Sequence, residues 1–364
     1  MKRLHFVITD LEIGGTPRVV RELAIRLRDY DFDTAVTCLS PWGPVADEIQ
    51  AAGVPVFAAG AKGPAQLPAA VKFVRHATAS ADTIFSFLVH ANVVAALANA
   101  GRGLPLVQSI QTTQPRPGWH WWAQAVAAKA ARKIIVPTPS TASVAAERSG
   151  IDPAKIVVIP NAVDACESPT QRRASDAAFR VGFLGRLDPV KRVPDLVAAV
   201  AKLPDVTLDI FGDGPERQAI VGAIRESGIG DRATLHGTYA SAATPLGKID
   251  VLVLPSEAEG FGLVLIEAMA AGVPTIGTDV PGIRDVIRHG DNGLLVPVNA
   301  PAALAAALTR VRDDASLVDR LVTNGRKTVA ERYAWDAVLR QYARRTAKDL
   351  CFVGATPASP ESQR

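Results

Sequence analysis

The stretch FRVGFLGRLDPVKRVPDLVAAVAKL, from Phe179 to Leu203, contains the alternation that decides the fold. An apolar run typical of a buried strand, FRVGFLG, is followed by the loop RLDPVKR and the helical pattern VPDLVAAVAKL. The same order occurs near the N-terminus, where RLHFVIT precedes DLEIGG and TPRVVRELAIRLRD. In that helix Thr16 can act as the N-cap and Pro17 suits the first helical position. Strands that alternate with helices favour parallel sheets with right-handed crossovers.

The alternation continues on both sides of one polar connection. Further apolar runs predict strands at TAVTCLS, TIFSFL, PLVQSI and KIIVPT, and then at VTLDIFG, ATLHG, DVLVLPS, VPTIGT and GLLVP. Between the two groups, NAVDACESPTQRRASDAA is polar and rich in turn residues, so we place the boundary near residues 165–178. We therefore predict an α/β protein with two Rossmann-like domains that face each other across a cleft. The N-terminal domain is expected over residues 1–168 and the C-terminal domain over residues 178–335.

Composition excludes several classes of protein. The chain has 364 residues, of which 48% are hydrophobic and 21% charged, as expected for a folded protein with more than one core. A net charge of +4 fits anionic small ligands or an acidic membrane surface, and is too small to indicate nucleic acid. The three cysteines show no CxxC spacing, which argues against a zinc site or a disulfide framework. With no signal-peptide or transmembrane pattern, we expect a cytoplasmic enzyme.

The segment EGFGLVLIEAMAAGVP, from Glu259 to Pro274, holds two glutamates eight residues apart. In one continuous helix they would be separated by about 12 Å along the axis. Paired carboxylates of glycosidases lie about 5–9.5 Å apart, so a hydrolase pair fits poorly. Instead we expect a strand that ends at Ser256, a glycine loop, and a helix that starts near Leu263 and ends at Gly272. The helix N-terminus would then form an anion site.

Several spaced motifs together resemble one family. They are PNAVD (160–164), GRLDPVKR, FGDGPER, LPSEAEGFGLVLIEAMAAGVPTIGT and HGDNGLLVP, with the paired glycines of the first loop upstream. In this order they resemble the retaining nucleotide-sugar glycosyltransferases of the GT-B fold, glycosyltransferase family 4. The resemblance is densest from Ile159 to Pro297. ERYAWDAVLRQYARR resembles that family's C-terminal helix, which implies that residues 336–350 cross back to the N-terminal domain.

The resemblance implies roles for four charged residues. Arg186 and Lys191 would hold the donor diphosphate, because arginine can bind two phosphate oxygens and lysine supplies a point charge. Glu259 would contact the donor sugar, and Glu267 would accept hydrogen bonds from the ribose hydroxyls. Arg186, Lys191 and Glu259 are therefore the catalytic candidates.

Backbone positions complete the expected donor site. Glycines in the first loop would allow close approach of the donor or acceptor, because no Cβ intervenes. Others would frame the nucleoside or lie at the start of the donor-binding helix. No base signature separates a UDP-sugar from a GDP-sugar. The donor-binding candidates besides Glu267 are Gly14, Gly15, Gly212, Gly237, Phe261, Gly262 and Leu263.

No metal or other cofactor is expected. Many glycosyltransferases hold a metal with an Asp-x-Asp motif, and the chain contains DFD at Asp31–Asp33. This motif precedes a predicted strand, so it lies at the strand's N-terminal end, whereas ligands of parallel sheets bind at the C-terminal end. We therefore expect a metal-independent reaction.

The acceptor side departs from the family pattern. Where the family often has a histidine, this chain has Gln111, which cannot act as a general base near neutral pH. The retaining mechanism ascribed to the family passes the acceptor proton to a leaving phosphate oxygen, so Gln111 is compatible with activity. His90, between a strand and a helix, is the other candidate and has a packing role as its alternative.

Two surface features stay open at this stage. PGWHWW (117–122) could form an acceptor platform, a wedge at a membrane interface, or a helix docked on the core. Arg18, Arg21, Arg26 and Arg28 share one helix and could meet anionic lipids or simply face solvent.

The main functional prediction is a retaining glycosyltransferase of the hexosyltransferase type. It would move a hexose from a UDP- or GDP-sugar to an acceptor hydroxyl in glycan, glycolipid or cell-envelope polysaccharide synthesis. The acceptor could be a glycan, a lipid-linked sugar or a small molecule, and a peripheral contact with the inner membrane face is open. The alternatives are a nucleotide-sugar-binding protein with weak or no catalysis, suggested by Gln111, and a nucleotide-sugar epimerase of similar fold. No nucleic-acid partner is expected.

Overall fold

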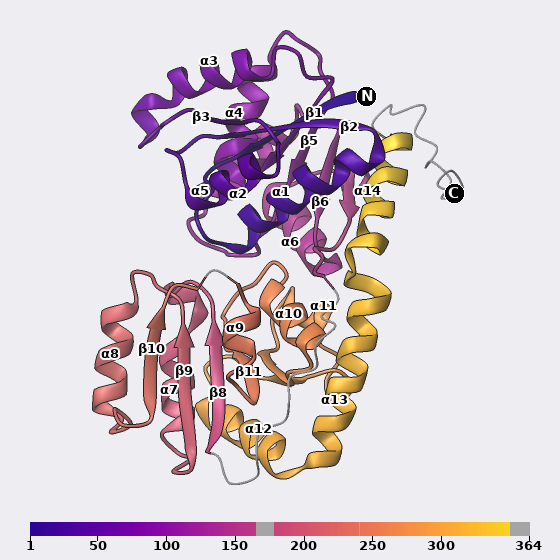
Figure 1. Ribbon diagram of the computed structural model, residues 1–364. Coiled ribbons are helices and arrows are strands. Elements are labelled where there is room, and N and C mark those ends of the chain that lie inside the picture. The colour runs from indigo at the N-terminus through magenta and orange to yellow at the C-terminus, as the bar shows by residue number, and fades with distance from the viewer. Residues whose placement is uncertain (165–177, 240, 350–364) are drawn as a thin grey trace. The chain divides into compact units, whose positions relative to one another are not determined.

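The computed structural model describes residues 1–164, 178–239 and 241–349, and within them the chain forms two compact units (Figure 1). The first unit comprises Met1–Gln111, Pro115–Ile159 and the segment that begins at Asp336. The second comprises Thr112–Gln114 and Pro160–Trp335. The predicted connection near residues 165–178 lies, except for residue 178, outside the described residues.

A seven-stranded parallel sheet, in the order β3-β2-β1-β4-β5-β6-β7, forms the centre of the first unit. Its core strands are buried on both faces, which explains their nearly continuous apolar runs. All the strands point the same way, so their C-terminal ends meet at one edge. The strands are β1 (Lys2–Ile8), β2 (Phe32–Cys38), β3 (Val56–Ala58), β4 (Thr83–Phe87), β5 (Leu106–Ser109), β6 (Lys133–Val136) and β7 (Ile156–Val158).

Helices follow the strands of the first unit in two groups. α1 packs against α2, while α3, α4, α5 and α6 pack side by side in that order. The chain moves from β1 outward to β3 and then in the opposite direction from β4 to β7, so right-handed crossovers put the two groups on opposite faces. The helices are α1 (Gly15–Arg26), α2 (Pro44–Ala51), α3 (Leu67–Ala77), α4 (Val89–Asn99), α5 (Trp119–Ala128) and α6 (Pro139–Ser149).

The start of α1 differs from the prediction. The helix begins at Gly15, Gly14 occupies the N-cap position, and no side chain caps it, so Thr16 is not the N-cap. Gly14 is extended, with φ of −173°. The glycine loop thus leads directly into the helix.

The last described helix, α14 (Trp335–Asp349), contributes to the core of the first unit from Asp336 onward. Tyr342 is 2% exposed, and its ring centroid lies 6.2 Å from that of Phe85 in β4. Burial raises the pKa of Tyr342. The ring centroid of Phe85 in turn lies 4.4 Å from that of Phe87. The first unit is therefore assembled from two segments far apart in the sequence.

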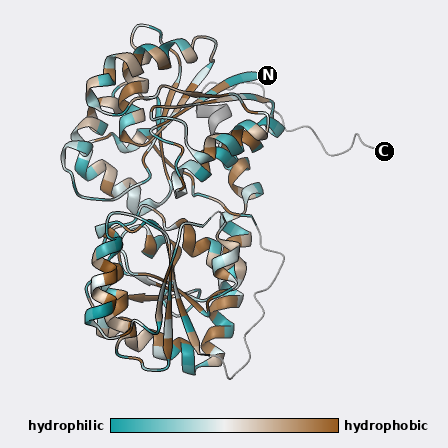
Figure 2. Ribbon diagram, turned by 60° about the vertical axis from the view of Figure 1, so that its left-hand side comes forward, coloured by the Kyte–Doolittle hydropathy of each residue, from teal (hydrophilic) through white to brown (hydrophobic). Residues whose placement is uncertain are grey.

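The second unit has a six-stranded parallel sheet in the order β10-β9-β8-β11-β12-β13. Figure 2 shows its central strands as hydrophobic, and Val251, Leu252 and Val253 are fully buried. Two parallel-sheet Rossmann-like units confirm the predicted α/β fold class. The strands are β8 (Phe179–Leu184), β9 (Val206–Phe211), β10 (Ala233–Gly237), β11 (Val251–Leu254), β12 (Thr275–Thr278) and β13 (Leu294–Val296).

The helices of the second unit connect these strands and then continue beyond them. The expected donor-binding helix begins at Leu263, as predicted, and ends at Ala271; Gly272 is its C-cap, and the left-handed φ of +77° there suits glycine. The helices are α7 (Val193–Val200), α8 (Arg217–Glu226), α9 (Ala243–Leu246), α10 (Leu263–Ala271), α11 (Ile283–Val286), α12 (Pro301–Asp313) and α13 (Ala315–Thr328), the last followed by a π-helical turn at Val329–Tyr333.

Candidate functional site

Two loops at the C-terminal edge of the second unit's sheet lie in direct backbone contact. The loop after β8 is joined to the loop after β9 by bonds from the N–H of Gly185 to the carbonyl of Phe211 (3.0 Å) and from the N–H of Leu187 to that of Asp213 (2.9 Å). A Cβ at Gly212 would lie only 1.9 Å from the carbonyl oxygen of Gly185. Gly212 is therefore required for packing of the loop that carries Arg186 and Lys191.

Lys191 and Glu259, predicted as separate contacts of the donor, form an ion pair between Nζ and Oε1. The two side chains are 20% and 12% exposed, so the pair is largely withdrawn from solvent. Ser256 Oγ donates a second hydrogen bond, of 3.0 Å, to the same carboxylate oxygen. Sequence reasoning missed Ser256, although its position at the end of a strand, three residues before Glu259, was a usable signal. The loops after β8 and β11 thus meet at one cluster of opposite charges.

The backbone around Glu259 is held from two sides. The N–H of Glu257 donates to the carbonyl of Val190, 2.8 Å away, which ties this loop to the one that carries Lys191. On the other side Gly282 approaches so closely that a Cβ there would lie 2.2 Å from the carbonyl oxygen of Glu259. Gly282 was also missed, and the Pro-Gly pair at 281–282 is its signal.

The other charged candidates differ in their surroundings. Arg186 is the most exposed, with 68% of its side chain accessible, and its Nε donates to Asp188 Oδ1 at 3.0 Å. Glu267 lies one turn inside α10 and is half-buried. The structure therefore brings Lys191 and Glu259 into contact, while Arg186 stands on the same loop with its guanidinium largely in solvent.

The loop into α10 contributes mainly backbone. Gly262 has a left-handed φ of +78° at the N-cap position, which glycine adopts without steric cost. Phe261 is 3% exposed and its ring packs edge-on against Tyr333, with 5.4 Å between centroids. Only the backbone of Phe261 therefore remains for a ligand. Leu263 is half-buried at the first helical position, where N–H groups have no intrahelical acceptor.

Next to Gly237 lies a charged cluster that the sequence did not suggest. Asp209, 3% exposed, accepts two hydrogen bonds of 2.8 Å from Arg180 and one of 2.7 Å from His236 Nε2. Burial acts to raise the pKa of Asp209, but these donors outweigh it and the pKa is lowered. The His236 ring stacks on the Phe211 ring, with 4.3 Å between the ring centroids and an angle of 8° between the ring planes. The three side chains come from three adjacent strands, so no local motif could reveal them.

Gly237 itself accepts a 2.7 Å hydrogen bond from the N–H of Gly212, which joins the loops that follow β9 and β10. Gly237 has a left-handed φ of +74°, and an added Cβ would meet no atom within 4 Å. Space is therefore open beside the cluster at this position.

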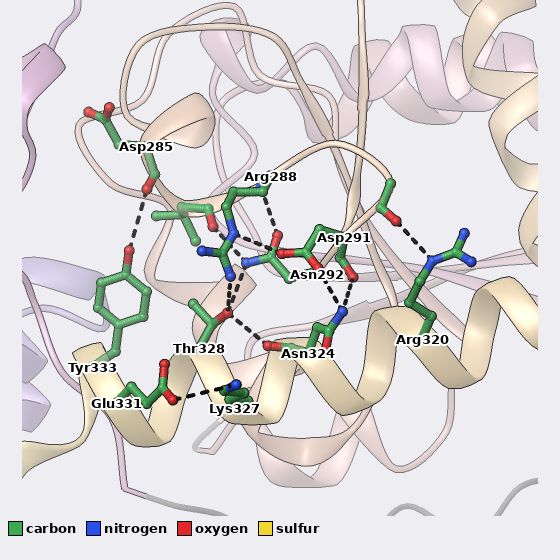
Figure 3. A network of polar contacts seen from close by, with 12 residues as sticks. Asp285, Arg288, Asp291, Asn292, Arg320, Asn324, Lys327, Thr328, Glu331 and Tyr333 are labelled. Atoms are coloured by element: carbon green, nitrogen blue, oxygen red, sulfur yellow. Dashed lines mark hydrogen bonds and ion pairs between the residues drawn. The ribbon is translucent and has the colours of Figure 1, made fainter.

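A polar network holds the motif HGDNG against α13 (Figure 3). Asn292, 1% exposed, donates from Nδ2 to the carbonyl of Val286 (3.1 Å) and to Thr328 Oγ1 (3.2 Å), and it accepts from the N–H of Arg288 (2.7 Å). Asn324 on α13 donates to Asp291 Oδ1 at 2.6 Å. This part of the family-like pattern thus has a structural reason.

In the first unit, two aromatic residues surround His90 where α4 and α5 begin. The ring centroid of His90 lies 5.7 Å from that of Trp119 and 5.4 Å from that of His120. Burial lowers the pKa of His90, and the charge of Asp10 at the end of β1 opposes that shift. Burial, and then the charge of His90, lower the pKa of His120. The C-terminal edge of this sheet therefore gathers imidazoles with a carboxylate nearby.

The remaining first-unit candidates lie near the same edge of the sheet. Gln111 follows β5, and its Nε2 donates to Ser109 Oγ at 2.7 Å. Gly14 and Gly15 start α1 after β1. A Cβ at Gly14 would make only ordinary contact, 3.5 Å from Pro17 Cδ, so packing does not demand glycine there.

The structure shows the surroundings of the two surface features left open by the sequence, the tryptophans of PGWHWW and the arginines of α1. Trp121 is 6% exposed and docks α5 on the core, whereas Trp119 and Trp122 are 53% and 70% exposed. On α1, Arg21 pairs with Glu22 and Glu48, and Arg26 pairs with Glu22, so acidic side chains neutralise part of the basic face of this helix.

The Asp-x-Asp motif of the sequence lies away from these clusters. Asp31 and Asp33 lie at the N-terminal end of β2, as expected from the sequence. Among residues 1–164, 178–239 and 241–349, no group of three or more His, Cys, Asp or Glu side chains has a geometry that could hold a metal ion.

Two family profiles match the chain in succession. The profile of Glycosyltransferase Family 4 matches residues 13–166, and that of Glycosyl transferases group 1 matches residues 167–328. The chain belongs to the family 4, group 1 glycosyltransferases. Both parts of the sequence resemblance, in the first loop and in the second unit, are thereby confirmed.

Similar proteins include members with different acceptors in their names. The N-acetyl-alpha-D-glucosaminyl L-malate synthase of Bacillus anthracis is 40% identical over 156 residues, which cover 42% of this glycosyltransferase and 41% of the relative. The D-inositol 3-phosphate glycosyltransferase of Mycobacterium bovis is 33% identical over 236 residues, which cover 59% of this chain and 49% of the relative. The chain thus spans about half or less of the length of these curated relatives.

Solved structures match over nearly the whole chain. HepE of Anabaena, crystallised with UDP and glucose, superposes with a TM-score of 0.86 at 21% identity, covering 95% of this chain and 100% of HepE. Sucrose-phosphate synthase of Thermosynechococcus elongatus superposes with a TM-score of 0.83 at 22% identity. The match covers 97% of this chain and 100% of the synthase chain. At this identity the likeness establishes the GT-B fold of the glycosyltransferase.

Proposed function

We propose that this glycosyltransferase moves a hexose from a nucleoside-diphosphate sugar, a UDP- or GDP-sugar, to an acceptor hydroxyl with retention of the anomeric configuration and without a metal. The observation that carries the proposal is the Lys191–Glu259 ion pair at the C-terminal edge of the second unit's sheet, with Arg186 on the same loop. Parallel α/β sheets bind ligands at this edge.

Two cations and a helix N-terminus suit a diphosphate. Arg186 has its guanidinium largely in solvent, within reach of an incoming anion, and Lys191 lies deeper on the same loop. The N-terminus of α10 adds N–H groups and a positive dipole end. Removal of one such donor typically costs about 3 kcal/mol of transition-state stabilisation. UDP and glucose in the HepE crystal structure support a nucleotide-sugar donor here.

Glu259 has two tasks in this proposal. In the absence of ligand it neutralises Lys191, so the buried ammonium has a partner. With a donor bound, the phosphate shares the ammonium and the carboxylate is available to a sugar hydroxyl. Glu267, half-buried one turn into α10, would accept the ribose hydroxyls.

The transfer step needs no separate base. The bond between the anomeric carbon and the diphosphate oxygen breaks, and a bond to the acceptor oxygen forms on the same face. The acceptor proton passes to the leaving phosphate oxygen, and the nucleoside diphosphate departs. Gln111 and His90, on the first unit, would then position the acceptor by hydrogen bonds. Gly14, where neither φ nor packing demands glycine, would allow close approach of the donor or acceptor.

We further propose a cytoplasmic location with a peripheral contact at the inner membrane face. That contact would bring the transferase to acceptors in glycan, glycolipid or cell-envelope polysaccharide synthesis.

The test is a panel of UDP- and GDP-sugars with glycan, lipid-linked and small-molecule acceptors, measured by nucleotide release and by the anomeric configuration of the product. Lys191→Met should lower kcat/KM about 10²–10³-fold. The matched control is Arg225→Met, an exposed cation on α8, which should leave it unchanged. Activity should persist in EDTA.

Other outcomes would identify the alternatives. Nucleotide binding without transfer to any acceptor would indicate a binding protein. Conversion of the donor to its epimer without an acceptor would indicate an epimerase. Full activity in both Lys191→Met and Glu259→Gln would contradict the proposed site.

A further inference from the structure

The charges of the first unit are distributed very unevenly along the sequence. Residues 49–146 contain eight lysines and arginines but a single acidic residue, Asp82. The whole chain has 40 basic and 36 acidic residues, so everything outside this segment is net negative by three. Asp82 is also engaged, because it accepts a 2.8 Å hydrogen bond from the N–H of Arg3. The segment is therefore net positive because it has almost no acidic residues, while the protein as a whole is nearly neutral.

This segment includes the helix layer α3–α4–α5. The contact between His90 and Trp119 aligns the starts of α4 and α5, which follow adjacent parallel strands. Leu97 lies seven residues beyond His90 and Val126 seven residues beyond Trp119. Both are therefore about 10 Å farther along their helices, at the same level.

Exposed apolar side chains cover the outer side of these two helices. Trp119, Trp122 and Val126 follow the i, i+3, i+7 spacing of one helix face and are 53%, 70% and 49% exposed. Leu97 on α4 is 48% exposed. We call this set, Leu97, Trp119, Trp122 and Val126, the α4–α5 face. Single exposed apolar residues are ordinary, but a contiguous group marks an interaction surface.

Basic residues lie around this face. Lys129, ten residues after Trp119, continues the same stripe at the end of α5 and is exposed. Arg116 is exposed just before α5, and Lys72 is exposed on α3, which packs against α4. An apolar centre with tryptophans and a cationic rim matches the layers of a membrane interface.

We propose that the α4–α5 face docks the protein on an anionic lipid bilayer, with Trp119 and Trp122 in the interfacial layer and Arg116 and Lys129 at the head groups. This gives the membrane contact of the proposed function a surface and a lipid class. Vesicle binding is measured apart from glycosyl transfer, so either can fail alone. No helix in the described part of the chain is long and apolar enough to cross a membrane, so the contact would be peripheral.

The positive charge of the α4–α5 face and its surroundings favours an anionic bilayer over a second copy of the chain, and its apolar residues favour a bilayer over nucleic acid. A second copy of the chain would bring two positive surfaces together, and like charges across an interface oppose association. Nucleic acid would use the cations but not the aliphatic Leu97 and Val126. An anionic bilayer uses both, because basic residues near its surface and buried apolar groups each contribute to binding.

The experiment is flotation of the purified protein with vesicles of phosphatidylcholine alone or with roughly 30 mol% of the anionic lipid phosphatidylglycerol, whose negative surface attracts basic residues. Wild type should bind only the anionic vesicles, and high salt should release part of it. Trp122→Ala should lower the partition coefficient about tenfold through lost apolar burial. Arg116→Glu and Lys129→Glu should each lower it about fivefold or more.

Matched controls separate this face from general charge and hydrophobicity. Trp42→Ala removes a tryptophan that is 42% exposed elsewhere on the first unit, and Arg225→Glu reverses an exposed charge on the second unit. Both should bind vesicles like wild type. Equal binding by Trp122→Ala and wild type would overturn the proposal. So would a dimer in solution that Trp122→Ala dissociates, since the face would then join two copies of the chain.

Discussion

Gly212→Ala tests how the loop after β8, which carries the proposed diphosphate contacts, is assembled with the loop after β9. The residue has φ of +141°, and an added Cβ would lie 1.9 Å from the carbonyl oxygen of Gly185 and 2.9 Å from its carbonyl carbon. These are backbone atoms, which cannot rotate away as a side chain can. The two loops would have to separate by about 1 Å before the contact reached a tolerable distance.

The size of the effect follows from what that separation breaks. Strain at an unfavourable φ costs about 1–3 kcal/mol. The hydrogen bonds from Gly185 to Phe211 and from Gly212 to Gly237 lie at the contact, and each contributes about 1 kcal/mol. The expected loss is therefore about 3–5 kcal/mol from the second unit. For a domain of this size, that lowers Tm by about 6–20 °C.

Scanning calorimetry with and without nucleotide measures both consequences. Because the displaced loop carries Arg186 and Lys191, Gly212→Ala should also lose most of its stabilisation by UDP or GDP. Gly222→Ala, within α8, is the control: a Cβ there meets nothing within 4 Å, so helix propensity should stabilise it by about 0.5–1 kcal/mol. A Tm for Gly212→Ala within about 2 °C of wild type would refute the reasoning.

Three further substitutions, one of them paired with a control, test other parts of the structure. Asp209→Asn should cost about 1–3 kcal/mol at pH 7. Because the pKa of Asp209 is lowered in the folded state, this difference should persist above about pH 4 and vanish as the pH falls further, which thermal unfolding across pH can check. Trp121→Ala should cost about 3–5 kcal/mol, since its side chain is buried, whereas Trp122→Ala should stay within about 0.5 kcal/mol in the same thermal assay. Asn292→Ala should cost about 1–3 kcal/mol in calorimetry, because it leaves buried polar groups unpaired, and a loss below 0.5 kcal/mol would mean that water replaces its amide.

Periodicity and glycine patterns in the sequence were sufficient for the fold class and for α10, but not for the two short edge strands β3 and β7 of the first unit. Burial on both faces makes parallel strands visible as apolar runs, and Gly272 marks the helix end because its φ requires glycine. The start of α1 was misjudged because a glycine loop entered the helix without the side-chain cap that Thr16 suggested.

Contacts between distant segments were the part that could not be predicted. Lys191 and Glu259 were each identified, but their pairing depends on two loops separated by 68 positions. The bonds of Asp209 to Arg180 and His236 cross three strands, and no short motif records such a register. The roles of all these residues in catalysis stay predictions.

The burial of Tyr342 against Phe85 has a consequence for protein synthesis. A ribosome makes the strands of the first unit early, but the helix that covers Phe85 is made only after the whole second unit. The first unit therefore waits with an apolar face uncovered while the second unit folds. Pauses or chaperone contacts during translation of residues 160–335 should affect the yield of the first unit more than that of the second. For the same reason, expression of residues 1–159 alone should yield an aggregation-prone fragment, and supplying α14 through a linker should rescue it.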